Sequence, residues 1–300
     1  MKNKNLSYTS ASAFPVKLII NSAWNVEGKL RPVHLQFIPT NVCPLNCSFC
    51  SCKDKDSRQI PFQKAKTEIK KFAKLGGQAI TITGGGEPLA YPKINEIIDL
   101  CHSLGLKIGL VTNGVLWKNL KTAEKITWCR ISTSVENHFR AEWAESIKKI
   151  PIDWAFSYVY TGDRKDLKNL LETVIALPIT HVRVVSDIFE ENKIPQVIKD
   201  EKIIYQNRDK YTRGMKQCWI SLVKPVLHVD GYYYPCCGVQ YARKGTKRDM
   251  IEEMRCADNL EEFYEKQIPF DGSKCDKCYY NQYNEALDLF NHEYKHIEFI

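Results

Sequence analysis

Apolar and polar residues follow one another in two alternating patterns along the first two thirds of the chain. Short β-branched or apolar runs predict strands, and apolar residues at helical spacing, such as Phe62, Ala65, Ile69 and Phe72, predict helices between several of them. The expected strands cover 33–38, 79–83, 107–111, 130–134, 154–160 and 181–185, and the further helices 94–104, 138–149 and 165–177. This alternation predicts an α/β fold with a parallel sheet. Six units are too few for a closed eightfold barrel, so we expect a partial (β/α)6 barrel.

The last third of the chain has a different pattern. Residues 187–216 are rich in charge and predict a connector, whereas 217–281 contain six cysteines. Asp230-Gly231 predicts a hairpin turn, and 282–292 predict a helix. The expected organisation is an N-terminal extension at 1–32, a barrel core at 33–186, the connector, and a small cysteine-rich domain at 217–300.

The amino-acid composition limits the classes of protein to which this chain can belong. The chain has 300 residues, a formal net charge of +8 and 12 cysteines. Its start is polar, and no apolar run approaches the roughly 18 residues of a membrane span, so we expect a cytoplasmic protein without a membrane partner. Many cysteines in such a protein indicate metal or redox chemistry rather than disulfides. The positive charge favours an anionic partner or balances negative cofactors.

Three cysteines lie within eight residues directly after the first expected strand. Cys43, Cys47 and Cys50 can bind three irons of a 4Fe-4S cluster and leave the fourth iron open to a ligand. A zinc knuckle or buried thiols are the alternatives. The spacing, with Phe49 before the last cysteine, resembles the signature loop of the radical S-adenosylmethionine (SAM) enzymes. The resemblance implies that the open iron chelates the methionine end of SAM and that Phe49 lies near its adenine.

Polar and glycine-rich turns follow the next strands. Thr83-Gly84-Gly85-Gly86-Glu87-Pro88 stands where this family has its Gly-Gly-Glu motif, which implies that Gly85, Gly86 and Glu87 bind the SAM amino group. Strand ends in the family also approach the methionine and ribose, which makes Ser134 the first ribose candidate, followed by Ser132 and Asn113. For Asn113-Gly114 a simple turn is an equal alternative.

A second cysteine set lies near the C-terminus. Cys218, twelve residues, Gly231, four residues and Cys236 resemble the opening of a SPASM domain, and Cys275 and Cys278 follow as a pair. No cysteine comes after Cys278, so the resemblance is to the shortened Twitch type with one auxiliary 4Fe-4S cluster. The layout is similar to that of the Twitch-bearing amino-cyclitol dehydrogenases of butirosin biosynthesis. A structural zinc held by the same four thiolates is the alternative, and Cys237 is a possible substitute for Cys236.

The resemblance implies an enzyme with SAM and two 4Fe-4S clusters, reduced by a partner such as flavodoxin or ferredoxin. It implies reductive cleavage of SAM to a 5′-deoxyadenosyl radical that abstracts a substrate hydrogen. Because a fully ligated auxiliary cluster is suited to accepting an electron, we expect a two-electron oxidation of an unknown small molecule. Modification of a ribosomal peptide or of a nucleobase is the alternative reaction, and a zinc-stabilised nucleic-acid-binding module is the non-enzyme alternative. Candidate catalytic residues on late strands are Arg183, Tyr158 and Tyr160.

Overall fold

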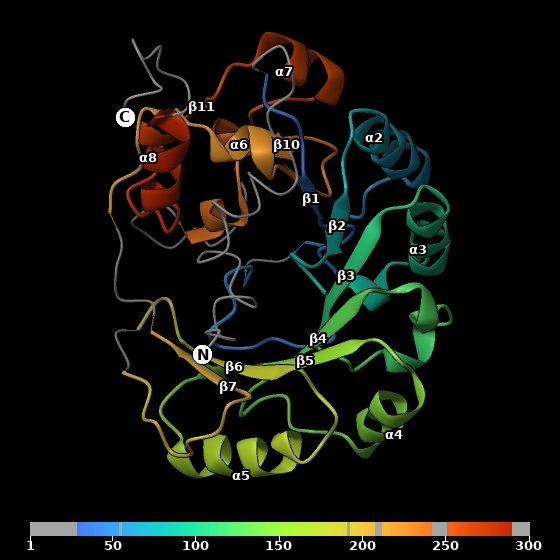
Figure 1. The fold of residues 1–300 in the computed structure, drawn as a ribbon, viewed down its shortest axis with the longest axis vertical. Coiled ribbons are helices and arrows are strands. Elements are labelled where there is room, and N and C mark those ends of the chain that lie inside the picture. The colour runs from blue at the N-terminus through green and yellow to red at the C-terminus, as the bar shows by residue number, and fades with distance from the viewer. Residues whose placement is uncertain (1–28, 54–55, 191–192, 208–211, 242–250, 290–300) are drawn as a thin grey trace, which may run out of the picture.

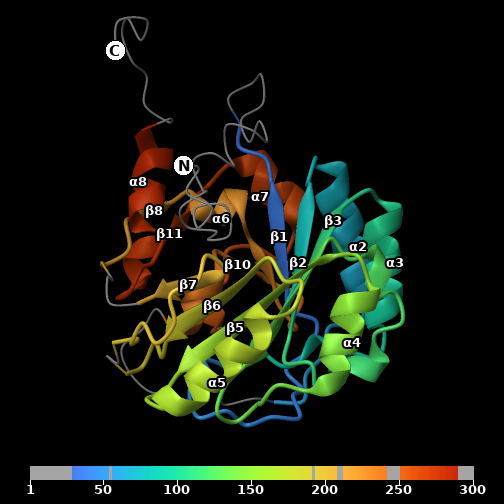
Figure 2. The ribbon, with the colours of Figure 1, turned by 60° about the horizontal axis from the view of Figure 1, so that its bottom comes forward.

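The computed structural model describes residues 29–53, 56–190, 193–207, 212–241 and 251–289. Its main feature is a nine-stranded sheet in the order β10-β9-β1-β2-β3-β4-β5-β6-β7 (Figures 1 and 2). All neighbouring pairs are parallel except β9 and β10, which form an antiparallel hairpin. The strands are β1 (His34–Phe37), β2 (Ala79–Ile82), β3 (Lys107–Thr112), β4 (Trp128–Thr133), β5 (Asp153–Tyr160), β6 (His181–Ser186), β7 (Ile203–Gln206), β9 (Val226–Leu227) and β10 (Tyr233–Tyr234).

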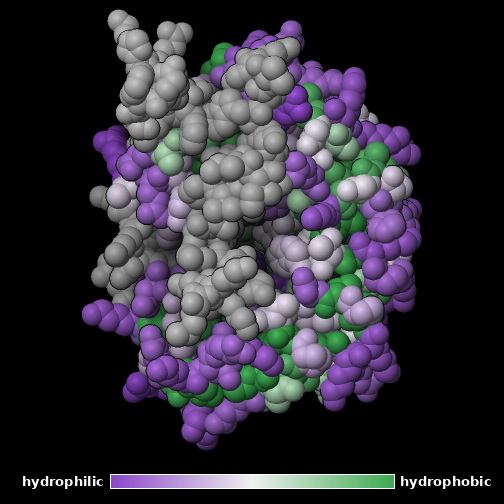
Figure 3. Space-filling view, viewed as in Figure 1, coloured by the Kyte–Doolittle hydropathy of each residue, from purple (hydrophilic) through white to green (hydrophobic). Residues whose placement is uncertain are grey.

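Four amphipathic helices cover the outer face of this curved sheet (Figure 1). They are α2 (Phe62–Lys74), α3 (Ile94–Ser103), α4 (Ala141–Lys149) and α5 (Arg164–Ile175). Their apolar stripes pack on the sheet, and hydrophilic side chains gather over the outward sides of α2 and α3 in Figure 3. Residues next to the helices define where they begin and end. At the start of α5 the Asp163 carboxylate accepts the backbone N–H of Asp166 at 2.9 Å and caps the helix. Gly76, with φ of +90°, follows the end of α2.

The two faces of the strands carry different chemistry because side chains alternate along a strand. Residues such as Ile82, Leu110, Ile131 and Phe156 are fully buried in the core beneath the helices. Their neighbours in sequence point to the opposite, inner face, which is more polar. We use the term inner face for this side of β1 to β7. Its residues are His34, Gln36, Ala79, Thr81, Lys107, Gly109, Val111, Trp128, Arg130, Ser132, Asp153, Ala155, Ser157, Val159, His181, Arg183, Val185, Ile204 and Gln206.

The C-terminal region forms a second, smaller core beside β1. Ile38, Val226, Tyr234, Met254 and Phe270 belong to this cluster. Its remaining elements are β8 (Gln217–Cys218), which pairs with β11 (Phe270–Asp271), and the helices α6 (Ile220–Val223), α7 (Leu260–Lys266) and α8 (Asn281–Leu289). Short 3-10 turns cover Pro88–Ala90, Trp117–Asn119, Ala123–Lys125, Cys237–Tyr241, Glu252–Met254 and Gly272–Lys274.

The predicted α/β partial barrel with a cysteine-rich C-terminal extension is confirmed, with corrections in detail. The expected connector at 187–216 contributes β7 to the sheet, which the sequence analysis missed. The expected helix at 138–149 begins only at Ala141. The hairpin at Asp230-Gly231 is present, with Gly231 at φ of +80°. Most of 1–32 and the last residues of the expected C-terminal helix lie outside the described residues.

A buried polar contact joins the two cores. The Tyr233 hydroxyl on β10 donates a hydrogen bond of 2.8 Å to the Glu68 carboxylate on α2. Glu68 is 1% exposed and also contacts the ammonium groups of Lys64 and Lys71 at 3.1 and 3.5 Å. The hairpin is therefore tied to a barrel helix by a charge-assisted bond in an apolar setting.

Removal of the hydroxyl in Tyr233→Phe should lower the free energy of unfolding by about 1–3 kcal/mol, because a buried carboxylate loses one donor. Denaturant unfolding followed by circular dichroism measures the change. The matched control is Tyr232→Phe in the same hairpin, whose ring lies 3.9 Å from the Arg255 guanidinium and whose hydroxyl has no hydrogen bond among the described residues. Equal losses in both variants would contradict the assignment.

Candidate active site

The first cysteine set lies on a loop that leaves the carboxyl end of β1. Cys43, Cys47 and Cys50 are all half-buried, and Phe49 lies between the last two, also half-buried. The loop folds back on itself, since the Cys50 N–H donates to the Cys47 carbonyl at 3.1 Å and the Cys52 N–H lies 3.4 Å from the Cys50 sulfur. Cys47 and Cys50 therefore share one short turn, Cys43 precedes them on the same loop, and thiols are the donors that an iron-sulfur cluster requires.

The glycine loop after β2 packs directly against the start of this cysteine loop. The N–H groups of Gly86 and Glu87 donate to the carbonyls of Thr40 and Val42, both at 2.8 Å. A Cβ added at Gly86 would lie 2.2 Å from the Val42 carbonyl oxygen, and one at Gly85 would lie 2.2 Å from the Asn41 side-chain oxygen. The glycines thus allow two backbones to approach each other more closely than any side chain permits.

Glu87 connects the glycine loop to the end of β3. Its buried carboxylate accepts bonds from the Thr112 hydroxyl at 2.5 Å, the Asn113 N–H at 2.7 Å and the Leu89 N–H at 3.0 Å. Burial raises the pKa of this carboxyl group, and the three hydrogen bonds oppose the shift. In this arrangement Glu87 fixes the position of its neighbours, and its contact with the SAM amino group stays a prediction.

The end of β3 continues the network to the first cysteine. The Asn113 side-chain amide lies 3.5 Å from the Cys43 sulfur as a donor, and its oxygen accepts the Val115 N–H at 2.9 Å. Asn137 donates to the backbone carbonyls of Asn113 and Ser132 at 2.8 and 2.7 Å. The structure therefore brings Asn113, Ser132 and Ser134 together at adjacent strand ends, although their roles toward SAM stay predictions.

A second acidic residue, Glu136, holds the cysteine loop from the other side. Both of its carboxylate oxygens lie 3.0 Å from the Ser48 N–H. Burial opposes its ionisation, but hydrogen bonds with Ser48 prevail and lower the pKa of the Glu136 carboxyl group. Burial raises the pKa of the Cys47 thiol to about 12, and the nearby Glu136 charge adds to that shift. The sequence analysis missed Glu136 and Asn137, because only the fold brings them to the loop.

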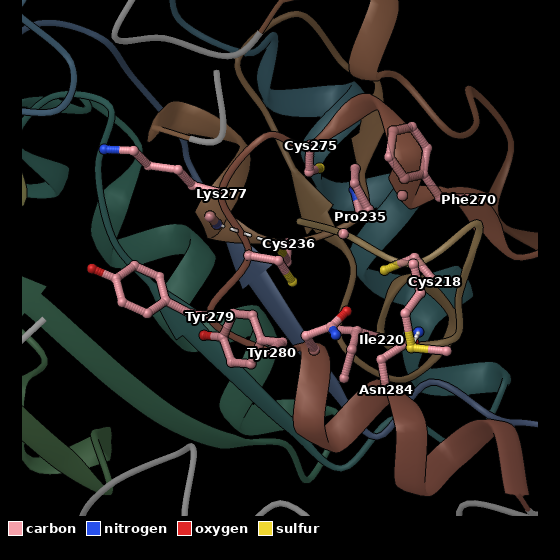
Figure 4. Close-up of a pocket in the computed structure, with 16 residues that line it drawn as sticks. Cys218, Ile220, Pro235, Cys236, Phe270, Cys275, Lys277, Tyr279, Tyr280 and Asn284 are labelled. Atoms are coloured by element: carbon pink, nitrogen blue, oxygen red, sulfur yellow. Dashed lines mark hydrogen bonds between the residues drawn. The ribbon is translucent and has the colours of Figure 1, made fainter. Parts of the chain in front are cut away.

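The second cysteine set lines one pocket. Cys218, Cys236, Cys275 and Cys278 all contribute to its wall. Figure 4 shows the first three arranged around the same space, with Phe270 and Pro235 on one side and Tyr280 on another. Burial raises the pKa of the Cys218 thiol to about 12 and also raises that of Cys236. The four residues come from three separate segments of the chain, and their role as ligands stays a prediction.

The spare cysteines have other surroundings. The Cys237 sulfur lies 3.7 Å from the Tyr280 hydroxyl, and the Cys256 thiol donates to the Tyr233 carbonyl at 3.3 Å. Neither residue belongs to the wall of the pocket. The N–H of Gly238 lies 3.3 Å from the Cys236 sulfur, a contact drawn as a dashed line in Figure 4. No three His, Cys, Asp or Glu side chains in the described part of the chain are grouped closely enough to hold a single metal ion.

The three candidate catalytic residues separate onto opposite faces of the sheet. Arg183 lies on the inner face, in register with Ser157 of β5. Tyr158 and Tyr160 lie on the outer face in the helix-covered core, which corrects the expectation that they face the cavity. The Tyr158 hydroxyl donates to the Asp166 carboxylate of α5 at 2.7 Å, and the Tyr160 hydroxyl donates to the Gly162 carbonyl at 3.0 Å. Their hydroxyls therefore bind a side chain of α5 and a turn carbonyl, which stabilises the packing of the strand against these segments.

Comparison with known proteins identifies this arrangement. The family model of the radical SAM superfamily matches residues 37–171, the stretch that contains both loops and the strands β2 to β5. This chain contains a radical SAM domain. The prediction of a radical SAM domain is confirmed, and the members of that superfamily are enzymes. The family implies SAM and a 4Fe-4S cluster as cofactors, and the three thiols on the first loop match that requirement.

Two curated relatives share sequence with parts of the chain. GTP 3′,8-cyclase of Aquifex aeolicus is 36% identical over 117 residues, which are 36% of this chain and 36% of the relative. PqqA peptide cyclase of Methylorubrum extorquens is 38% identical over 87 residues, which are 28% of this chain and 22% of the relative. The chain spans about a third of the length of the curated relatives it matches first.

Solved structures extend the likeness to most of the fold. The crystal structure of Streptococcus suis SuiB bound to precursor peptide SuiA aligns with a TM-score of 0.57 and 17% identity. The alignment covers 83% of this chain and 67% of that chain, so the likeness in fold reaches beyond the radical SAM domain. Among the described residues, every helix is too short or too polar to cross a bilayer.

Loss of the Glu136 carboxylate in Glu136→Ala should loosen the cysteine loop, because the Ser48 N–H loses both acceptors. We expect less iron per chain after reconstitution and faster bleaching in air. The reduction potential of the remaining cluster should rise, since a nearby negative charge disfavours an added electron. Iron assay and a redox titration monitored by electron paramagnetic resonance measure these effects. Glu145→Ala, at an exposed position of α4, is the control, and a Glu136→Ala variant that matches it in iron content and potential would refute the role.

Proposed function

We propose that this protein reductively cleaves SAM and uses the resulting 5′-deoxyadenosyl radical to abstract a hydrogen atom from its substrate. The radical SAM domain at 37–171 is the observation that carries this proposal, together with the three thiols on the loop that follows β1. Cys43, Cys47 and Cys50 would hold a 4Fe-4S cluster, which would supply the single electron that splits SAM into methionine and that radical.

The chain contributes position and environment to this chemistry. The glycine loop and Glu87 fix the ends of β2 and β3 beside the cysteine loop, where Gly85, Gly86 and Asn113 are available to SAM. Ser132 and Ser134 lie at the neighbouring end of β4 and are proposed to contact the methionine and ribose. Phe49 is proposed to contact the adenine from the cysteine loop.

We further propose that Cys218, Cys236, Cys275 and Cys278 hold one auxiliary 4Fe-4S cluster. Four thiolates complete the coordination of such a cluster and leave no open iron for substrate. Its suitable role is to accept an electron. Bound there, the cluster would accept one electron after the substrate has lost a hydrogen atom to the deoxyadenosyl radical, and with one proton passing to a base the overall reaction would be a two-electron oxidation of the substrate. An external donor such as flavodoxin or ferredoxin supplies the electron for SAM cleavage.

The alternatives differ in the substrate class. The names of the two curated relatives indicate a nucleotide and a peptide, but each match covers about a third of this chain. This leaves the inner face and the C-terminal region to determine which substrate is bound. Mass analysis of candidate small molecules, peptides and nucleotides after turnover separates these classes, and a product isomeric with its substrate would contradict the oxidation.

Anaerobically reconstituted protein should form 5′-deoxyadenosine and methionine from SAM in the presence of dithionite. Cys47→Ala should lose this activity by at least a hundredfold, because the cluster loses one of three ligands. Liquid chromatography with mass detection quantifies both products. Cys101→Ala, a change in the buried face of α3, should retain activity. Fully iron-loaded wild-type protein that never cleaves SAM would overturn the proposal.

Iron and sulfide counting tests the auxiliary cluster. Wild-type protein should contain about eight irons, and a Cys275→Ala, Cys278→Ala double variant about four. Cys256→Ala, which removes a thiol outside the pocket, should retain about eight. Zinc in place of the second set of irons, found by elemental analysis of anaerobically purified protein, would favour the structural-zinc alternative.

A further inference from the structure

Gln240 is a buried side chain that connects the C-terminal region to the first cysteine loop. It lies on the short 3-10 turn Cys237–Tyr241 and is 6% exposed. Its side-chain oxygen accepts the Ser51 hydroxyl at 3.3 Å, although the two residues are 189 positions apart in the sequence. Ser51 directly follows Cys50. The Gln240 amide is therefore held beside one of the three thiols that are proposed to bind the first cluster.

The nitrogen end of this amide has no acceptor. The Gln240 side-chain nitrogen is buried and has no hydrogen-bond partner among the residues that the structure describes. Buried donors are nearly always paired, because a donor that leaves water without finding a new acceptor costs free energy. A buried donor of this kind indicates a ligand that supplies the acceptor. Oxygen atoms and the sulfur atoms of an iron-sulfur cluster both accept N–H groups.

Gln240 lies outside the auxiliary pocket. The wall of that pocket includes Cys236 and Gly238, which belong to the same segment, but not Gln240. The Cys236 sulfur has a donor of its own, because the Gly238 N–H lies 3.3 Å from it. These two observations separate the Gln240 amide from the auxiliary site, even though only three residues stand between it and Cys236.

The first cysteine loop has N–H donors beside its sulfur atoms. The Asn113 side-chain amide lies 3.5 Å from the Cys43 sulfur, and the Cys52 N–H lies 3.4 Å from the Cys50 sulfur. Both donors come from the radical SAM domain at 37–171. Donors of this kind stabilise the reduced, more negative form of a bound cluster. A further donor beside Cys50 fits the same pattern, with the difference that Gln240 comes from the C-terminal region.

We propose that the Gln240 amide donates an N–H hydrogen bond to the 4Fe-4S cluster that Cys43, Cys47 and Cys50 would hold. This inference rests on the proposed function, because that function places a cluster on this loop. The acceptor would be the Cys50 thiolate or a neighbouring sulfide. The bond would raise the reduction potential of the cluster, since it stabilises the added negative charge. Through Gln240 the C-terminal region would thus influence the cluster that cleaves SAM.

Pulsed electron paramagnetic resonance of reduced, reconstituted protein with 15N in its glutamine side chains tests this bond. The signal of the first cluster is recognised by its change when SAM is added. Before that addition, we expect a 15N coupling on this signal in wild type. Gln240→Leu should lose the coupling and shift the reduction potential of the cluster to a more negative value. Gln63→Leu, at an exposed position of α2, is the matched control and should keep both.

A second variant separates the donor from the contact with the loop. Gln240→Glu keeps an oxygen for the Ser51 hydroxyl but has no N–H donor. It should also lose the coupling, and its potential should be more negative than that of Gln240→Leu, because the change adds a negative charge.

Three results would overturn the proposal. The first is a wild-type signal without the 15N coupling, or a wild-type potential in both variants. The second is a coupling on the signal that does not respond to SAM, which would assign the amide to the auxiliary cluster. The third is a coupling that appears only after SAM is added, which would assign it to SAM. If wild-type protein fails to cleave SAM, the proposed function fails, whereas the 15N coupling is measured on the cluster alone.

Discussion

The contact between the glycine loop and the start of the cysteine loop is the constraint on which the candidate active site depends. Two backbone hydrogen bonds of 2.8 Å join Gly86 and Glu87 to Thr40 and Val42. They form only because no Cβ stands between the two segments. The cysteine loop has no regular structure of its own, so its direction is set by this contact and by Glu136. A parallel sheet places the two loops at the same edge, and the glycines convert that proximity into direct contact.

Two carboxylates also hold the loops of the candidate active site in place. The Glu87 carboxylate accepts hydrogen bonds from three donors near the ends of β2 and β3. The Glu136 carboxylate, which follows β4, accepts the Ser48 N–H. The Asn113 amide then reaches the Cys43 sulfur. Hydrogen bonds and charges around thiolate sulfur tune the potential of a bound cluster, so the same residues that hold the loop also influence its redox chemistry. Asn113 after β3 and Glu136 after β4 therefore affect both the position of the cysteine loop and the potential of a cluster bound there.

The sequence predicts those parts of the site whose residues lie close together along the chain. The cysteine spacing and the glycine run each lie within a few residues, and the hydrophobic patterns are regular enough to predict most strands and four helices. Glu136 could not be found, because its contact with Ser48 spans 88 residues and depends on the finished sheet. The short strand β7 was hidden in a charged connector. Strand alternation separated Tyr158 from Arg183, but only the packed helices show which of the two faces is the inner one.

Because side chains alternate along each strand, the outer and inner faces of the sheet carry different residues. Most outer positions of β4, β5 and β6 are apolar or aromatic and bury their side chains beneath helices, which stabilises the fold. The inner positions are thereby released from the packing of that core and can carry Arg130, His181 and Arg183.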